Sequence, residues 1–346
     1  IQLRGDLPAH PMTNTIFLAV GAGMASFIGT TGAAMLLIRP LLQTNRERKH
    51  VKHTVIFFIF LVCNCGGCLL PIGDPPLFLG YLMGVPFMWT FILWPHWLAV
   101  CLILLVVYYI WDCKAYKKET VKDIKLDETQ VEKLQLTGKI NFLFLLGVVF
   151  SVALLKPGQH FLDDENLPKI PEFFRETMQM LFVVASLKFT PKGIRKANKF
   201  NYVAIGEVAA LFVGIFITMQ VPLEILDVKG ASLGVDTPLK FFWITGILSS
   251  FLDNAPTYVV FFKTAGTLPL AEGATIVAGL SEQILIAISL GAVFMGANTY
   301  IGNGPNFMVK SIAEQSGIKM PSFFGYMLWS ICILFPLFLL ISIIIF

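Results

Sequence analysis

The sequence predicts an all-α polytopic membrane protein made of two inverted repeats, each with a re-entrant helical hairpin and a broken transmembrane helix. The 346 residues have a mean hydropathy of +0.73 and only 14% charged residues, which is typical of a membrane protein. Residues 250–258 set Asp253, Asn254 and a proline between apolar segments far shorter than the roughly 20 residues of a spanning helix. We therefore expect a hairpin tip at this point, enclosed by protein because its backbone is polar.

A second copy of this stretch predicts the repeat. Residues 25–39 align with residues 249–263 at a constant offset of 224. Residues 67–78 align with residues 296–307 at an offset of 229, and both of these segments interrupt an apolar run with glycine and proline. The matched pairs include Ser26 with Ser250, Phe27 with Phe251, Arg39 with Lys263, Gly73 with Gly302, Asp74 with Asn303 and Pro76 with Pro305.

The first repeat is expected to take residues 1–112. Its elements are a hairpin over residues 15–42, a broken helix over 54–85 and a helix over 88–111. The loop after the hairpin carries several lysines and arginines, which places it in the cytoplasm. His50 and His53 lie in this loop; we expect them to be solvated, with pH sensing as the alternative.

A charged connector over residues 113–139 separates the repeats, and its alternating charges indicate a solvated cytoplasmic segment. The second repeat takes residues 140–346. Its elements are helices over 140–155, 173–187 and 202–221, a hairpin over 241–265, a broken helix over 284–315 and a helix over 323–346. The resulting topology puts the two hairpins on opposite faces of the membrane, as in an inverted repeat. Three helices precede the second hairpin and none precedes the first, so we expect about three N-terminal helices to be missing from the sequence.

Charge and cysteine patterns exclude several classes of protein. The net charge of +4 is spread over short loops, which argues against a nucleic-acid surface. The six cysteines lie in or beside apolar runs, so a secreted disulfide framework does not apply. Cys63, Cys65 and Cys68 have spacing that suits a soft metal, but small residues where helices pack are the more common reason for such a cluster.

Two acids in apolar surroundings, Asp74 and Asp253, are the strongest functional signals. A carboxylate at the bilayer centre costs about 3 kcal/mol on insertion scales, so each needs a reason. Burial favours the neutral carboxyl and a bound cation favours the charged one. One aspartate can therefore hold either a proton or a sodium ion.

The expected ion site uses the oxygen ligands that hard cations prefer. We expect Na⁺ to be held by Asp253 as the main carboxylate together with Asn254, Asn303 and Asn306, with Asn298 and Thr257 nearby. The corresponding residues of the first repeat are Thr30, Thr31, Asn64 and Asp74. Glu207 is a candidate for a proton path or for an ion pair with a loop lysine. No bound cofactor is expected.

Each of these residues also has a purely structural interpretation. Asp253 and Asp74 are both placed where they could cap a helix, Asp74 directly before two prolines. Thr30 and Thr31 are also suited to cap the second arm of their hairpin. Arg39 and Lys263, at the hairpin mouths, fit cations that reach the membrane interface.

At these motifs the chain resembles the ion transporter superfamily, which groups D-type sodium/proton antiporters with citrate and dicarboxylate carriers. The carboxylate carriers have Ser-Asn-Thr at both hairpin tips, where this chain has Gly29-Thr30-Thr31 and Asp253-Asn254-Ala255. The second tip is similar to the Asp-Asn tips of the antiporters, whereas the first departs from them. The resemblance implies a transport unit of hairpins and broken helices, and a homodimer.

The resulting expectation is a secondary active transporter, not an enzyme, that exchanges Na⁺ or Li⁺ for H⁺ by alternating access. The alternative in the same class is a sodium-coupled citrate or dicarboxylate transporter. Two intramembrane aspartates also allow an aspartyl protease, and polar tips allow a channel. The expected partners are the lipid bilayer and small inorganic cations, and the expected location is the bacterial inner membrane, crossed several times.

Overall fold

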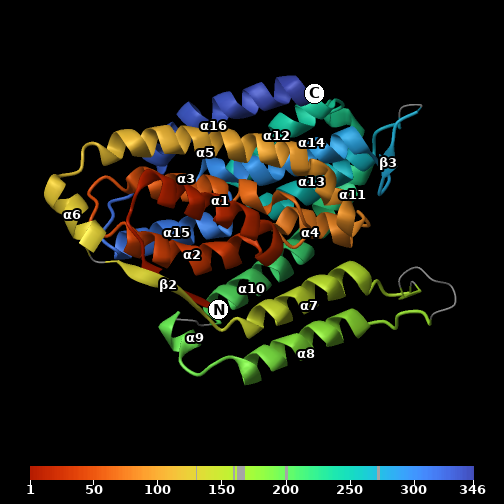
Figure 1. Cartoon of the computed structure of the whole chain (residues 1–346). Helices are drawn as coiled ribbons and strands as arrows, with labels where there is room; N and C mark the ends of the chain where they lie inside the picture. Colours follow the sequence, from red (N-terminus) through yellow and green to blue (C-terminus); the bar gives the residue numbers. More distant parts are fainter. Residues whose placement is uncertain (130, 159, 162–167, 199–201, 271–272) are drawn as a thin grey trace. The chain divides into compact units, whose positions relative to one another are not determined.

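The chain folds into packed helices with only short strands. The computed structural model describes residues 1–346 except 130, 159, 162–167, 199–201 and 271–272 (Figure 1). The chain divides into two compact units. The smaller unit contains residues 1–5 and 133–203, and the larger contains residues 6–132 and 204–346.

The first part of the larger unit contains both arms of the first hairpin. Its elements are α1 (Pro11–Ile28), α2 (Thr30–Thr44), α3 (Lys52–Leu61), η1 (Cys65–Cys68), α4 (Pro75–Leu82), η2 (Phe87–Leu93), α5 (Trp94–Tyr116) and α6 (Val121–Thr129). The hairpin turns at Gly29, whose φ of 79° is a conformation that glycine adopts without strain. The first arm begins at Pro11, earlier than the expected residue 15, because proline suits the first helical turn.

The second part of the larger unit contains the second hairpin. Its elements are α10 (Val203–Thr218), α11 (Gln220–Lys229), η4 (Gly230–Leu233), α12 (Pro238–Phe251), α13 (Asn254–Gly266), β3 (Ile276–Val277), β4 (Leu280–Ser281), α14 (Glu282–Met295), η5 (Gly296–Asn298), α15 (Gly304–Gln315) and α16 (Phe323–Ile345). Strands β3 and β4 form a short antiparallel pair. Helix α11 and turn η4 were not among the elements expected from the sequence.

The smaller unit is a helical hairpin beside a short two-stranded sheet. Its elements are β1 (Gln2–Asp6), β2 (Glu132–Thr137), α7 (Ile140–Leu154), α8 (Phe174–Phe189) and α9 (Ile194–Ala197), with β1 paired to β2. The hydroxyl of Ser186 on α8 donates to Asn141 Oδ1 on α7 at 2.6 Å, which joins the two helices through a polar contact.

Three helical stretches among the described residues are long and apolar enough to span a membrane: α1, the continuous stretch Phe87–Tyr116 and α16. Large apolar side chains such as Val106 on α5 and Ile343 on α16 are exposed, as expected of surfaces that face lipid. The predicted fold class, an all-α polytopic membrane protein, is confirmed. Because α1 has 18 residues, the first arm is longer than the sequence analysis expected.

The core of the larger unit forms around the two broken helices. Helix α3 is buried along nearly its whole length, which matches its lack of any polar face. Helix α12 packs along α14, and α13 packs against α4. Leu79 of α4, Ile215 of α10, Met219 directly before α11, and Ala255 and Val259 of α13 form a shared apolar cluster. This packing holds the polar interruptions of the helices at a fixed place.

Candidate functional site

The carboxylate of Asp74 lies where the tips of both hairpins meet. Thr30 Oγ1, at the tip of the first hairpin, donates to Asp74 Oδ1 at 3.0 Å. Asn254 Nδ2, at the tip of the second, donates to Asp74 Oδ2 at 2.6 Å. Asn303 Nδ2 donates to Asp74 Oδ1 at 2.9 Å. Asp74 is only 1% exposed, so these donors replace water around a buried acid.

The local sequence explains why this carboxylate points away from its own helix. Asp74 has extended backbone dihedrals and precedes Pro75 and Pro76 in the first turn of α4. Its side chain accepts no capping hydrogen bond from α4, because the two prolines have no backbone N–H to donate. The capping interpretation therefore does not describe Asp74, whose carboxylate is used for contacts between the repeats.

Asp253 shows the opposite behaviour. Its Oδ1 accepts from Ala255 N at 3.0 Å, which is the capping contact at the start of α13. The structure therefore differs from the expected ranking: the carboxylate contacted by both tips is Asp74, while Asp253 caps its own helix. The two acids therefore have different partners: Asp74 accepts from Asn254 and Asn303, whereas Asp253 accepts from Ala255 N.

Two buried amide oxygens, those of Asn64 and Asn254, have no hydrogen-bond partner among the described residues. Asn64 Nδ2 donates to Ile59 O and to Asn306 Oδ1, both at 2.8 Å. These contacts fix the orientation of the Asn64 amide and leave its Oδ1 buried without a hydrogen bond. Asn254 Oδ1 is likewise buried without a hydrogen bond, because its amide nitrogen faces Asp74. Buried oxygens of this kind are costly unless something fills the position.

The two unsatisfied amides lie around Gly296. A Cβ built on Gly296 would lie 3.1 Å from Asn64 Oδ1 and 3.6 Å from Asn254 Nδ2. Asn306 helps to hold this arrangement, since its Nδ2 donates to Gly296 O and to Thr299 O, both at 2.9 Å. A glycine at position 296 therefore keeps the space between the amides open.

Four of the described helices begin at this carboxylate. Thr30 and Asn254 are the first residues of α2 and α13, while Asp74 and Asn303 immediately precede α4 and α15. Each helix N-terminus carries a partial positive charge of about half an elementary charge. The site thus combines positive helix ends with a negative carboxylate and neutral amides, a mixture that suits the binding of small ions.

Equivalent serines support the two hairpins through equivalent contacts. Ser26 Oγ donates to Gly66 O at 2.6 Å and accepts from Leu69 N at 3.0 Å. Ser250 Oγ donates to Met295 O at 3.0 Å and accepts from Asn298 Nδ2 at 2.9 Å. The two serines differ by the offset of 224 and their partners by the offset of 229, so the repeat found in the sequence recurs in the contacts. Asn298 thus supports the hairpin at Ser250.

The remaining predicted residues lie in several environments. Asn303 and Asn306 lie in the network around Asp74 and Asn64, and both are buried. Thr257 is buried, and its hydroxyl donates to Asp253 O at 2.9 Å within α13. Thr31 is exposed on α2. Glu207 falls in α10, but its side chain lies outside the described part of the chain.

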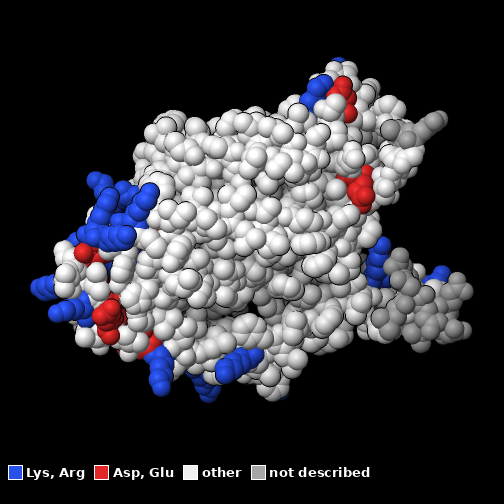
Figure 2. All heavy atoms as spheres, turned by 45° about the horizontal axis from the view of Figure 1, so that its top comes forward, with Lys and Arg blue, Asp and Glu red and all other residues white. Residues whose placement is uncertain are grey.

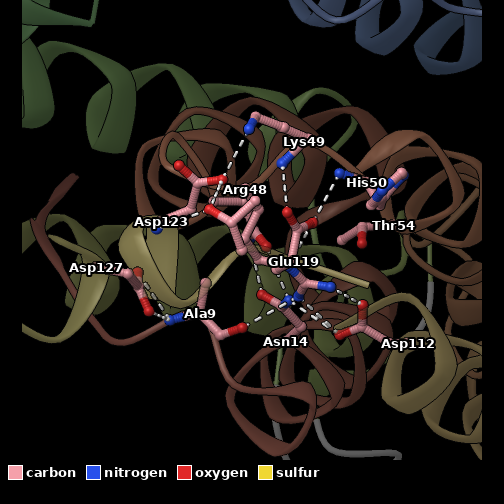
Figure 3. Close-up of polar contacts among 12 residues, drawn as sticks. Ala9, Asn14, Arg48, Lys49, His50, Thr54, Asp112, Glu119, Asp123 and Asp127 are labelled. Carbon is pink, nitrogen blue, oxygen red and sulfur yellow. Dashed lines mark hydrogen bonds and ion pairs between the residues drawn. The ribbon is translucent and has the colours of Figure 1, made fainter. Parts of the chain in front are cut away.

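The structure also contains a polar cluster that the sequence analysis did not predict. Asp112, fully buried near the end of α5, accepts from Arg48 Nη2 at 2.5 Å and from Asn14 Nδ2 at 3.2 Å (Figure 3). His53 Nε2 lies 2.8 Å from Asp112 Oδ1, so this histidine is buried and not solvated as expected. One feature of the sequence could have indicated this cluster: Asp112 is a single acid directly after a long apolar run.

Side chains that commonly bind metals do not gather in the described part of the chain. No group of three or more His, Cys, Asp or Glu side chains among the described residues could hold a metal ion. Cys63, Cys65 and Cys68 are free and buried. They line the interrupted helix as small packing residues.

Comparison with known proteins identifies the family. A search of curated proteins and a search of solved structures returned no significant match. A family model described as "Putative citrate transport" matches residues 1–346, the whole chain. The family is part of the citrate transporter group of the ion transporter superfamily, in line with the resemblance seen in the sequence. The chain therefore belongs to this citrate transport family of membrane transporters.

Proposed function

We propose that the chain is a secondary active transporter that exchanges Na⁺ for H⁺ at Asp74 by alternating access. The observation that carries the proposal is the combination of one buried carboxylate with two buried amide oxygens that lack partners. Carboxylate and amide oxygens are ligands that a hard cation accepts. Asp74, Asn64 Oδ1 and Asn254 Oδ1 would hold the sodium ion, and the same carboxyl would hold the proton in its absence.

The other amides act as supports in this proposal. Asn303 donates to Asp74, and Asn306 donates to backbone carbonyls while accepting from Asn64. Both residues thereby orient the oxygens that face the ion. The ion set differs from the one expected from the sequence because Asn306 Oδ1 already accepts from Asn64, whereas the amide oxygens of Asn64 and Asn254 are the ones buried without a hydrogen bond. Asp253 supports the start of α13.

A second candidate is cation-coupled uptake of citrate or a related carboxylate. The family match favours it, and so do the four helix N-termini around Asp74, because positive helix ends suit a carboxylate substrate. In this case the cation at Asp74 would offset the negative charge of the acid beside the substrate. We further propose that the protein works as a homodimer in the bacterial inner membrane.

Flux measurements in proteoliposomes separate the two candidates. We expect an imposed sodium gradient to change the internal pH, read with an entrapped dye, in the absence of any organic anion. Uptake of labelled citrate should then stay at the level of empty liposomes. Sodium-dependent citrate uptake without any pH change in citrate-free buffer would reject antiport in favour of the second candidate.

Thr30 and Thr31 provide a matched pair of variants. Thr30→Val removes a hydroxyl that donates to Asp74 while keeping the side-chain shape. A hydrogen bond to a charged group is worth about 1.5–3 kcal/mol, so we expect transport to fall at least about tenfold. Thr31→Val, at the exposed neighbouring position, should leave transport nearly unchanged. Equal rates for the two variants would contradict the role of Thr30.

A further inference from the structure

A second polar feature of the larger unit is a cavity of about 800 Å³ at the end where α3 begins and α5 ends. We call it the basic cavity. The residues lining it are Lys49, His50, Lys52, His53, Val107, Ile110, Trp111, Lys114, Ala115, Lys118 and Trp329. None of these described residues is acidic, and lysine and arginine side chains gather at this end of the molecule, where α6 lies in Figure 1 (Figure 2).

The positive charge of the basic cavity is largely uncompensated. Lys49 pairs with Asp123 at 3.0 Å, and the hydroxyl of Thr120 together with Lys49 holds the pKa of Asp123 below its usual range. Among the described residues, Lys52, Lys114 and Lys118 form no ion pair with an acid. Three ammonium groups are thus available to a ligand.

The nearby acids are engaged with other partners. Asp112 is bound by Arg48 (Figure 3) and by His53, which lines the basic cavity. Glu119 accepts from the backbone N–H groups of Lys49 and His50 at 3.1 and 2.8 Å. These contacts turn both carboxylates toward the protein. They also fix the loop before α3 against α5, so that the wall of the basic cavity is held in place.

The wall along α5 changes from apolar to basic. Val107, Ile110 and Trp111 are followed by Lys114 and Lys118. At about 1.5 Å per residue, positions 107 to 114 span roughly 10 Å along α5, and Lys118 follows two residues after the helix ends. The exposed Ile110 and Trp111 belong to a helix long enough to span the membrane. The apolar part of the wall therefore faces acyl chains and the lysines reach the headgroup level.

Two stacked tryptophans mark the boundary between these parts. The rings of Trp111 on α5 and Trp329 on α16 have centroids 4.8 Å apart and planes 29° apart. Tryptophan prefers the interface between hydrocarbon and headgroups. Their position between the apolar and basic parts of the cavity places the lysines at the depth of lipid phosphates.

We propose that the basic cavity binds an anionic phospholipid, with its phosphate held by Lys52, Lys114 and Lys118. The acyl chains lie along Val107, Ile110 and the tryptophan pair. A lipid is favoured over a soluble anion because half of the wall along α5 is apolar and exposed. Basic pockets between helices at the cytoplasmic side of a membrane are suited to phosphate headgroups. The proposal does not depend on what the transporter carries.

Native mass spectrometry of the purified protein tests the proposal. The protein is taken from vesicles of equal parts phosphatidylglycerol and phosphatidylcholine, and retained lipids are counted. We expect retention of phosphatidylglycerol over phosphatidylcholine, and a preference at least about tenfold weaker in the triple variant Lys52→Gln, Lys114→Gln, Lys118→Gln. The triple variant Lys117→Gln, Lys122→Gln, Lys125→Gln removes the same charge at exposed positions that do not line the basic cavity and should keep the preference.

The possible results either support or overturn the lipid assignment. Equal loss in both triple variants would mean that overall charge, and not the basic cavity, attracts the lipid. Displacement of phosphatidylglycerol by millimolar inorganic phosphate would show that the cavity takes a free anion instead. Retention of both lipids to the same extent by the wild-type protein would also overturn the proposal. The same variants are also assayed for transport, because a variant that still transports is folded.

Discussion

Replacing Asp74 with asparagine is expected to reduce sodium-driven proton flux at least about hundredfold. The variant keeps the size of the side chain but removes the only charge that the proposed site offers to a cation, and it places an amide NH₂ against three donors. An uncompensated charge in a buried site costs several kcal/mol, and about 2.7 kcal/mol already corresponds to a hundredfold loss. The internal pH of proteoliposomes under a sodium gradient is the measurement.

Asp253→Asn is the matched control for this experiment. It makes the same chemical change at the tip of the second hairpin, and its remaining amide oxygen can still accept from Ala255 N. We expect Asp253→Asn to retain flux within about threefold of wild type, as for an N-cap exchanged between the equally favourable Asp and Asn. The reverse result, with flux abolished by Asp253→Asn and retained by Asp74→Asn, would return the central role to Asp253.

Removing the carboxylate of Asp112 is expected to produce the largest loss of stability. Arg48 and His53 are both buried against it, so Asp112→Ala leaves a guanidinium and an imidazole without their acceptor. Breaking one partner of a buried ion pair typically costs about 3–5 kcal/mol. The midpoint of thermal unfolding of the purified protein in detergent should fall by many degrees.

Asp123→Ala is the control for Asp112→Ala. Its partner Lys49 is 65% exposed, and ion pairs between exposed groups contribute little to stability because solvent screens them. The thermal midpoint should therefore hardly move. A double variant, Arg48→Leu with Asp112→Leu, should be more stable than Asp112→Ala alone, because it removes both buried charges together. Similar midpoints for Asp112→Ala and Asp123→Ala would show that the cluster does not stabilise the fold.

The sequence predicted the places where helices are interrupted because those places depend on local composition. Apolar runs too short to span, followed by glycine, proline and polar residues, located the tips at Thr30 and Asn254. The offsets of 224 and 229 also identified Asp74 and Asn303 as equivalent, and these two side chains are in contact. The opposite orientation of the two repeats in a membrane stays a prediction.

The roles within the site could not be read from the sequence. The two prolines after Asp74 account for its missing cap, but contacts between segments far apart in the sequence decide which carboxylate meets the opposite hairpin. The free oxygen of Asn64 depends on Asn306, 242 residues away, which fixes the orientation of the amide. The burial of Asp112 likewise depends on Arg48 and Asn14, which come from elements far apart in the sequence.

Asp74 connects the two repeats through its hydrogen bonds. A charged carboxylate accepts from Thr30 of one repeat and from Asn254 and Asn303 of the other, so it ties the two halves together. A protonated carboxyl is a weaker acceptor because it has lost its negative charge and part of its accepting capacity, so its hydrogen bonds to these three donors weaken. The protonation of this one carboxyl would then determine how strongly the two repeats are held together and how readily one moves relative to the other.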